Sequence, residues 1–271
     1  MNSWISIALQ NMSIKITAEL VKELREATGV SVMQCKNALE EAEGDMEKAL
    51  IILKKKSSSI AIKKAGRTAS DGIVIVKEVD NKALLLVLHS ETDFVAKNND
   101  FIILANKLAD MAIKDGIDEM KAKTEEMINE VVQKIGEKIE LGRVEEVNGL
   151  ILGSYIHNNK SAVIVSLSSG TKELARDIAM HIAAMKPAFT TREEITENDK
   201  KKVIEVFEKE VGESDKPEEI KKKMLEGKIS TYFKEQTLMD QSFIKNPELT
   251  IETLLKNNNS KLISFISESI N

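Results

Sequence analysis

The chain has 271 residues, of which 42% are hydrophobic and 31% charged, a composition typical of globular domains. Its 39 basic and 44 acidic residues leave a net charge of -5, so direct binding to nucleic acid is not expected. One cysteine and three widely spaced histidines predict no disulfide framework, no metal site and no bound cofactor.

The sequence contains no apolar run long enough to span a bilayer. Residues 1–9 are mildly apolar but lack a basic start and a small-residue cleavage site, so they do not indicate a signal peptide. We therefore expect a cytoplasmic protein without a membrane partner.

Three short helices are expected at the N-terminus. Thr17, Ser31 and Asp45 each precede a segment with apolar residues at helical spacing, and Ser31 is followed three residues later by Gln34 in a capping-box pattern. The third helix is expected to end near Lys54. A bundle of this size has a small core, which favours a docking module over a catalytic domain.

A basic and then serine-rich stretch, residues 54–59, follows these helices. It loses the apolar period and is therefore interpreted as a connector at a domain boundary. The alternative, that these residues are the solvated end of the third helix, is equally favoured.

An internal repeat organises the middle of the chain. Residues 71–75 match residues 148–152, and each segment opens a predicted hairpin. The turns are expected at 81–82 and 158–159, and the returning strands at 83–88 and 162–167.

The first copy of the repeat carries extra residues between its second strand and the following helix, within residues 90–98. An insertion at a strand end can vary without unfolding the scaffold, so it is a candidate functional loop. Phe94 is its one aromatic residue. From chemistry alone, Phe94 is either an inward anchor for the helix start or an exposed contact for a partner.

The remaining segments complete an α+β pattern. A charged amphipathic helix is expected over 118–134 and a further strand of the first sheet over 138–147. Two helical stretches, 193–211 and 216–236, predict a projecting antiparallel coiled coil. The same patterns predict that the tail forms a helix over 250–256 and a strand over 261–267 that returns to the second sheet.

Catalytic motifs are missing from the sequence: it has no glycine-rich phosphate loop, nucleophile elbow, HExxH or CxxC. Cys35 lies on the apolar side of its helix, which favours a buried thiol over a nucleophile. His181 is expected in or near the core. His157 precedes a hairpin turn, where it is either a plain turn residue or a contact for a partner.

Three sequence blocks resemble the translation elongation factor Ts family, the nucleotide-exchange factors of elongation factor Tu. They are ITAELVKELR at 16–25, TDFVAKN at 92–98 and MHIAAMKP at 180–187. The resemblance extends from about Ser13 to the end of the chain. Residues 1–11 lie upstream of where the family normally begins, and Met12 is an alternative start.

The resemblance implies a core of two related subdomains with small antiparallel sheets. Its four expected parts are a ubiquitin-associated (UBA)-like three-helix docking domain at 13–56, a core subdomain N with the TDFV insertion at 57–147, a core subdomain C at 148–190 and 237–271, and a coiled-coil helical hairpin at 191–236. Self-association through that hairpin is left open.

The resemblance also implies a guanine nucleotide exchange factor without covalent chemistry. It would bind elongation factor Tu with GDP, displace Mg²⁺ and GDP, hold the nucleotide-free form and be released by GTP. The residues that match the family's contacts with elongation factor Tu are Asp93 and Phe94, flanked by Thr92 and Val95; Arg25, Val32, Met33 and Lys36 in the N-terminal helices; and His157 in the second subdomain. The family usually has methionine where Val32 stands, which predicts less reach at that contact.

Two other classes of function remain as alternatives. An adaptor that binds ubiquitin-like proteins would use only the first three helices and would leave the insertion at 90–98 unexplained. A small hydrolase or transferase would act through Cys35 or His157, but no base and orienting group accompany either residue at a recognisable spacing.

Overall fold

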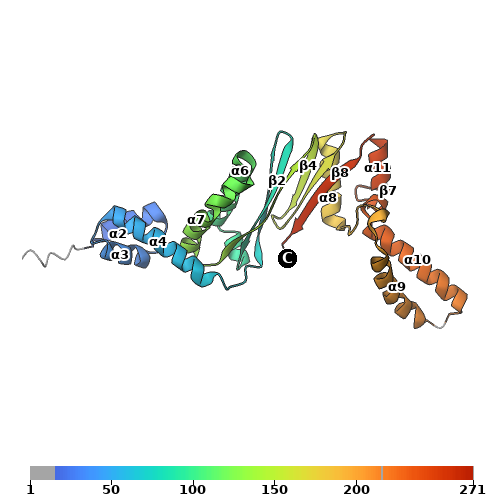
Figure 1. The fold of residues 1–271 in the computed structure, drawn as a ribbon, viewed down its shortest axis with the longest axis horizontal. Coiled ribbons are helices and arrows are strands. Elements are labelled where there is room, and N and C mark those ends of the chain that lie inside the picture. Colours follow the sequence, from blue (N-terminus) through green and yellow to red (C-terminus); the bar gives the residue numbers. More distant parts are fainter. Residues whose placement is uncertain (1–15, 215, 271) are drawn as a thin grey trace, which may run out of the picture. The chain divides into compact units, whose positions relative to one another are not determined.

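A computed structural model describes residues 16–214 and 216–270 (Figure 1). Residues 1–11, the alternative start Met12 and the first residues of the expected docking domain lie outside this part of the chain. The described residues form two compact units. Unit 1 contains the residues up to Ile73 together with Leu86–Val144 and Ile270, and unit 2 contains Val74–Leu85 and Glu145–Ser269.

The three expected N-terminal helices are present in unit 1 (Figure 1). They are α2 (Ala18–Thr28), α3 (Val32–Glu41) and α4 (Met46–Lys64). Their shared core consists of small and medium apolar side chains: Leu24, Val30, Cys35, Ala38, Leu39, Ala42, Ala49 and Leu53. The predicted position of Cys35 on the apolar side of its helix is thus confirmed.

The caps predicted for these helices are confirmed. The Thr17 hydroxyl accepts a hydrogen bond from the Leu20 amide (3.3 Å), and the Ser31 hydroxyl accepts one from the Gln34 amide (3.4 Å). An Asp45 carboxylate oxygen accepts from a backbone amide of the third helix at 3.0 Å. Each side chain satisfies one of the amides that a helix start leaves without an internal partner.

The interpretation of residues 54–59 as a connector is wrong, because α4 continues through them to Lys64. Ser57 is buried and its hydroxyl donates to the carbonyl of Lys54 (2.7 Å). The side chains of Lys54 and Ser58 also contact the helix α7 (Ile117–Ile135), through an ion pair with Glu126 and a 3.5 Å hydrogen bond from Asn129. Packing against α7 supports this helix where its own apolar period is weak.

The first repeat contains the hairpin strands β1 (Asp71–Val79) and β2 (Lys82–Ser90), as predicted. The strand predicted after α7 is β3 (Ile139–Asn148), and the sheet order is β1-β2-β3. The short helix α5 (Asp93–Ala96) and the long helix α6 (Asn99–Asp115) follow β2. Helix α6 packs against α7 through a buried apolar face that includes Phe101, Leu104, Leu108 and Met120.

The second repeat lies in unit 2 and forms an antiparallel sheet in the order β4-β5-β8. Its strands are β4 (Ile151–His157), β5 (Ser161–Leu167) and β8 (Leu262–Ser269). The tail strand therefore returns to this sheet, as expected. Helix α8 (Lys172–Met185) packs on β4 and β5.

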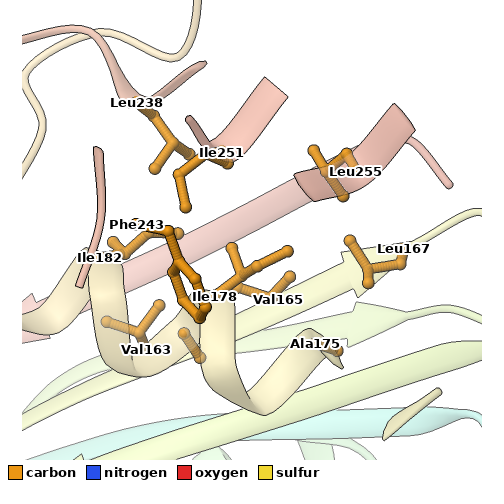
Figure 2. Packing of buried hydrophobic residues seen from close by; sticks show 11 residues of the cluster. Val163, Val165, Leu167, Ala175, Ile178, Ile182, Leu238, Phe243, Ile251 and Leu255 are labelled. Atoms are coloured by element: carbon orange, nitrogen blue, oxygen red, sulfur yellow. The ribbon is translucent and has the colours of Figure 1, made fainter. Parts of the chain in front are cut away.

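The core of unit 2 joins α8, β5 and the C-terminal segment (Figure 2). Ile178 and Ile182 of α8 face Val163 and Val165 of β5, and a second group of apolar side chains covers them from the other side. That group is Leu238, Phe243, Ile251 and Leu255, from the 3-10 turn η2 (Leu238–Asp240), the strand β6 (Ser242–Phe243) and the helix α11 (Ile251–Asn257). Thr250 caps α11 as predicted, while β6 and its partner β7 (Asn246–Thr250) are elements that the sequence patterns missed.

His181 is completely buried in this core and joins three segments. Its Nε2 atom lies 2.9 Å from Oε1 of Gln241, and its Nδ1 atom accepts a hydrogen bond from the Ile244 amide (3.3 Å). Burial lowers the pKa of His181 below its ordinary value of 6.5. The predicted location of His181 in the core is confirmed.

The two helical stretches expected after residue 190 are α9 (Glu197–Gly212) and α10 (Glu218–Gln236). Helix α9 starts after the 3-10 turn η1 (Arg192–Glu194), because Thr196 and Asp199 form a capping box at Glu197. The two helices pack together in antiparallel directions, since Phe207 contacts Tyr232 and Glu210 pairs with Lys228 at 2.6 Å. No described helix of the chain is long and apolar enough to cross a membrane.

Candidate partner-binding site

The insertion in the first repeat folds into α5, a single helical turn between β2 and α6. Thr92 is its N-cap, and the Thr92 hydroxyl accepts a hydrogen bond from the Val95 amide at 3.4 Å. Asn98 then caps α6 by accepting from the Asp100 amide at 2.8 Å. The second repeat makes the same strand-to-helix connection with residues 168–171 and no helix.

Phe94 has 81% of its surface exposed, although it is a large apolar residue. The interpretation of Phe94 as an inward anchor is therefore wrong. Val95 and Ala96 take that role, with 6% and 4% exposed. Val95 is thus largely covered by its own chain, and the expected contact of Val95 with a partner stays a prediction.

The side chain of Asp93 lies beside that of Lys97 on the same turn, with Oδ2 and Nζ 2.7 Å apart. This hydrogen bond raises the pKa of Lys97 above its ordinary value. Both groups are largely exposed, so the ion pair contributes little to stability. Asp93 and the exposed Phe94 are adjacent residues of this turn, where both side chains are accessible to a partner.

A second exposed apolar surface lies on α3. Val32 is 51% exposed and Met33 65%, while Cys35 and Leu39 on the opposite side of the helix are buried. Lys36 belongs to the exposed side and pairs with Glu40 at 3.5 Å. Helical spacing thus separates a core face from a face that is free to dock.

The remaining expected contact residues are Arg25 and His157. Arg25 is exposed in the last turn of α2, in the same bundle as α3. His157 is exposed at the end of β4, where its Nδ1 atom lies 3.1 Å from the Tyr155 hydroxyl and its ring stacks on the Tyr155 ring. His157 belongs to unit 2, whereas all the other expected contact residues belong to unit 1.

Two glutamates that the sequence analysis did not single out hold the base of α5. Glu137 accepts hydrogen bonds from both the amide and the hydroxyl of Thr92, at 3.0 to 3.1 Å. Glu91 accepts from the Lys138 amide (2.6 Å) and from Arg67. The Lys138 amide is the main reason that the pKa of Glu91 lies below its ordinary value. Local sequence patterns could not predict these contacts, because the partners are 45 and 47 residues apart in the sequence.

Cys35 and His157 are the two residues through which the alternative enzyme would act. Cys35 is fully buried, with its thiol 3.6 Å from the Val30 carbonyl oxygen and 3.9 Å from the Thr28 hydroxyl. His157 has Tyr155 and Asn158 as its ring-nitrogen neighbours. Within residues 16–214 and 216–270, no three His, Cys, Asp or Glu side chains gather as metal ligands.

An exposed aromatic on a fixed turn, together with an exposed apolar helix face, is typical of a protein that acts by binding other proteins.

Residues 91–270 match the family model described as "Elongation factor TS". The elongation factor Ts of Marinobacter nauticus is 42% identical over 93% of this chain and 89% of its own. Those of Hahella chejuensis and Aeromonas salmonicida are each 40% identical, over 93% and 92% of this chain and 90% and 89% of theirs.

The chain belongs to the elongation factor Ts family. This membership assigns it a role in the elongation phase of protein biosynthesis. The resemblance inferred from the three sequence blocks is thereby confirmed.

Proposed function

We propose that this protein is a guanine nucleotide exchange factor that binds elongation factor Tu and accelerates the release of GDP. The observation that carries the proposal is the 81% exposure of Phe94 on a turn whose next two residues, Val95 and Ala96, are buried. In a chain of this family, such a residue is suited to enter a partner rather than to stabilise its own fold.

The proposed contacts divide into docking and displacement. Arg25, Val32, Met33 and Lys36 would dock the N-terminal helices, which we propose to be UBA-like, on the GTPase domain. Phe94 would act as an apolar wedge near the Mg²⁺ and phosphate site, with Asp93 supplying polar contacts beside it. His157 would add a contact from unit 2.

The mechanism follows from thermodynamic linkage. A factor that binds the nucleotide-free GTPase more tightly than the GDP-bound form must weaken GDP binding by the same ratio. GTP binding would then release the factor in the same way. No covalent bond forms or breaks, so the protein itself needs no catalytic group.

The helices α9 and α10 are proposed to form an antiparallel coiled coil. Their charged exposed faces and their contact through Phe207 and Tyr232 support this assignment. Sedimentation velocity of the purified chain distinguishes a monomer from a dimer formed through this pair.

The test of the exchange function is the release rate of a fluorescent GDP analogue from elongation factor Tu at saturating factor. We expect strong acceleration by the natural chain and its loss in Phe94→Ala, since a hot-spot aromatic contributes at least about 2 kcal/mol of coupling, roughly thirtyfold. Ile62→Ala is the matched control, because Ile62 is 74% exposed in the same unit and has no proposed contact.

Three outcomes separate the candidate functions. Acceleration that Phe94→Ala leaves unchanged would keep the exchange function but refute the wedge. No acceleration by the natural chain would refute exchange, and retention on a ubiquitin column would then favour the adaptor. An activity that disappears in Cys35→Ser would favour an enzyme.

A further inference from the structure

Helix α5 is too short to fix its own direction. It consists of four residues, Asp93–Ala96, and a single turn gains few internal hydrogen bonds for the dihedral angles that it fixes. The direction in which Phe94 points therefore depends on what holds the two ends of the turn.

Glu137 holds the first end. Its carboxylate accepts hydrogen bonds from the Thr92 amide (3.1 Å) and from the Thr92 hydroxyl (3.0 and 3.1 Å). A hydroxyl has one proton, so donation to Glu137 leaves an oxygen lone pair for the Val95 amide, which lies 3.4 Å away. Glu137 thus orients the cap that starts the helix bearing Phe94.

The contact is reciprocal. The neighbouring residues 91–92 and 137–138 each supply one carboxylate and one amide. Glu137 accepts from the amide of Thr92, and Glu91 accepts from the amide of Lys138 at 2.6 Å. Arg67 Nη1 lies 3.2 Å from a Glu91 oxygen and compensates its charge. We call the four residues Glu91, Thr92, Glu137 and Lys138 the carboxylate bracket. All four are half-buried, where charge-assisted hydrogen bonds are stronger than at an exposed site.

Building on the proposed exchange function, we propose that Glu137 is a positioning residue for Phe94. It touches neither nucleotide nor GTPase and acts through Thr92 on the direction of α5. A wedge held in its binding direction loses little conformational freedom when it enters a partner, so more of its contact energy can displace the nucleotide. Phe94 itself is too exposed for the bracket to serve core packing through it.

The first test measures GDP release from elongation factor Tu over a range of factor concentrations. For Glu137→Ala we expect a maximal stimulated rate about tenfold lower, as for loss of a charged hydrogen bond. The half-saturating concentration should change less, because the α3 face is intact. Glu137→Gln, which retains one acceptor oxygen, should lie between Glu137→Ala and the natural chain. Glu119→Gln is the matched control, because Glu119 is an exposed glutamate in the first turn of α7 and lies outside the carboxylate bracket.

A double-mutant cycle with Phe94→Ala separates positioning from general stabilisation. If Glu137 acts through Phe94, Glu137→Ala should cause no further loss once Phe94 is alanine. An equal loss in both backgrounds, or no loss in either, would overturn the proposal.

Amide hydrogen exchange on the protein alone gives a readout that does not depend on the partner. We expect the Val95 amide to exchange faster in Glu137→Ala than in the natural chain, while amides of the α3 core remain protected. Unchanged exchange at Val95 would refute the positioning role. If the natural chain does not stimulate GDP release, the exchange function fails, and the Val95 amide still decides whether Glu137 orients α5.

Discussion

Replacement of Gly153 by alanine should severely destabilise unit 2. Gly153 lies in β4 directly beneath α8, and an added Cβ would come within 2.4 Å of the Arg176 amide nitrogen and 2.7 Å of the Ala175 carbonyl carbon. These obstacles are backbone atoms, so no side-chain rotation can relieve the clash. The helix and the strand must separate.

The size of the effect follows from that separation. To restore ordinary van der Waals distance, α8 must move by about 1 Å, and a gap of that size loses roughly half of the dispersion energy of each contact across it. The buried side chains of Ile178 and Ile182 would lose contacts with the sheet as a result. We therefore expect a loss of about 3 kcal/mol or more, the upper end for overpacked cores.

Urea unfolding followed by far-ultraviolet circular dichroism measures this loss. Gly227→Ala is the matched control, because Gly227 is exposed within α10 and an added Cβ meets nothing within 4 Å. Alanine there should stabilise the chain by about 0.5 to 1 kcal/mol through its higher helix propensity. A Gly153→Ala chain within about 1 kcal/mol of the natural one would refute the reasoning from close packing.

Two further predictions concern buried groups. His181 has a lowered pKa, so below pH 6.5 the unfolded chain binds a proton that the folded chain does not, and stability should fall by up to about 1.4 kcal/mol per pH unit. Urea midpoints between pH 7.5 and 5.5 should therefore decline less in His181→Gln; an equal decline would contradict this. Cys35 should react with an aromatic disulfide only on unfolding, since its thiol is buried; rapid reaction of the native chain would show that the α2–α4 core opens readily.

Local signals in the sequence predicted most of the secondary structure. The caps at Thr17, Ser31, Asp45 and Thr250 depend on neighbours within three residues, and the structure contains all four. The repeated hairpins were recognisable because turn residues and β-rich strands recur in the same order in both copies. The insertion was found because it breaks that repetition.

The elements that were missed depend on distant residues. The last eleven residues of α4 have a basic and serine-rich sequence, and their helical structure is supported by Asn129 and Glu126 of α7. The alternatives for Phe94 could be decided only by its exposure, and the buried position of Val95 required the fold of α5. Glu91 and Glu137 meet their partners, Lys138 and Thr92, only when β2 and β3 join one sheet.

The continuous helix α4 has a consequence for how a partner is selected. A flexible tether would let the α3 face and the α5 turn search for their sites independently, at an effective concentration set by tether length. A helix held against α7 instead keeps the α3 face and the α5 turn at one spacing within unit 1. Under the proposed function, a GTPase engages both surfaces only if its two complementary sites have the same spacing, so spacing itself discriminates between partners with similar local surfaces.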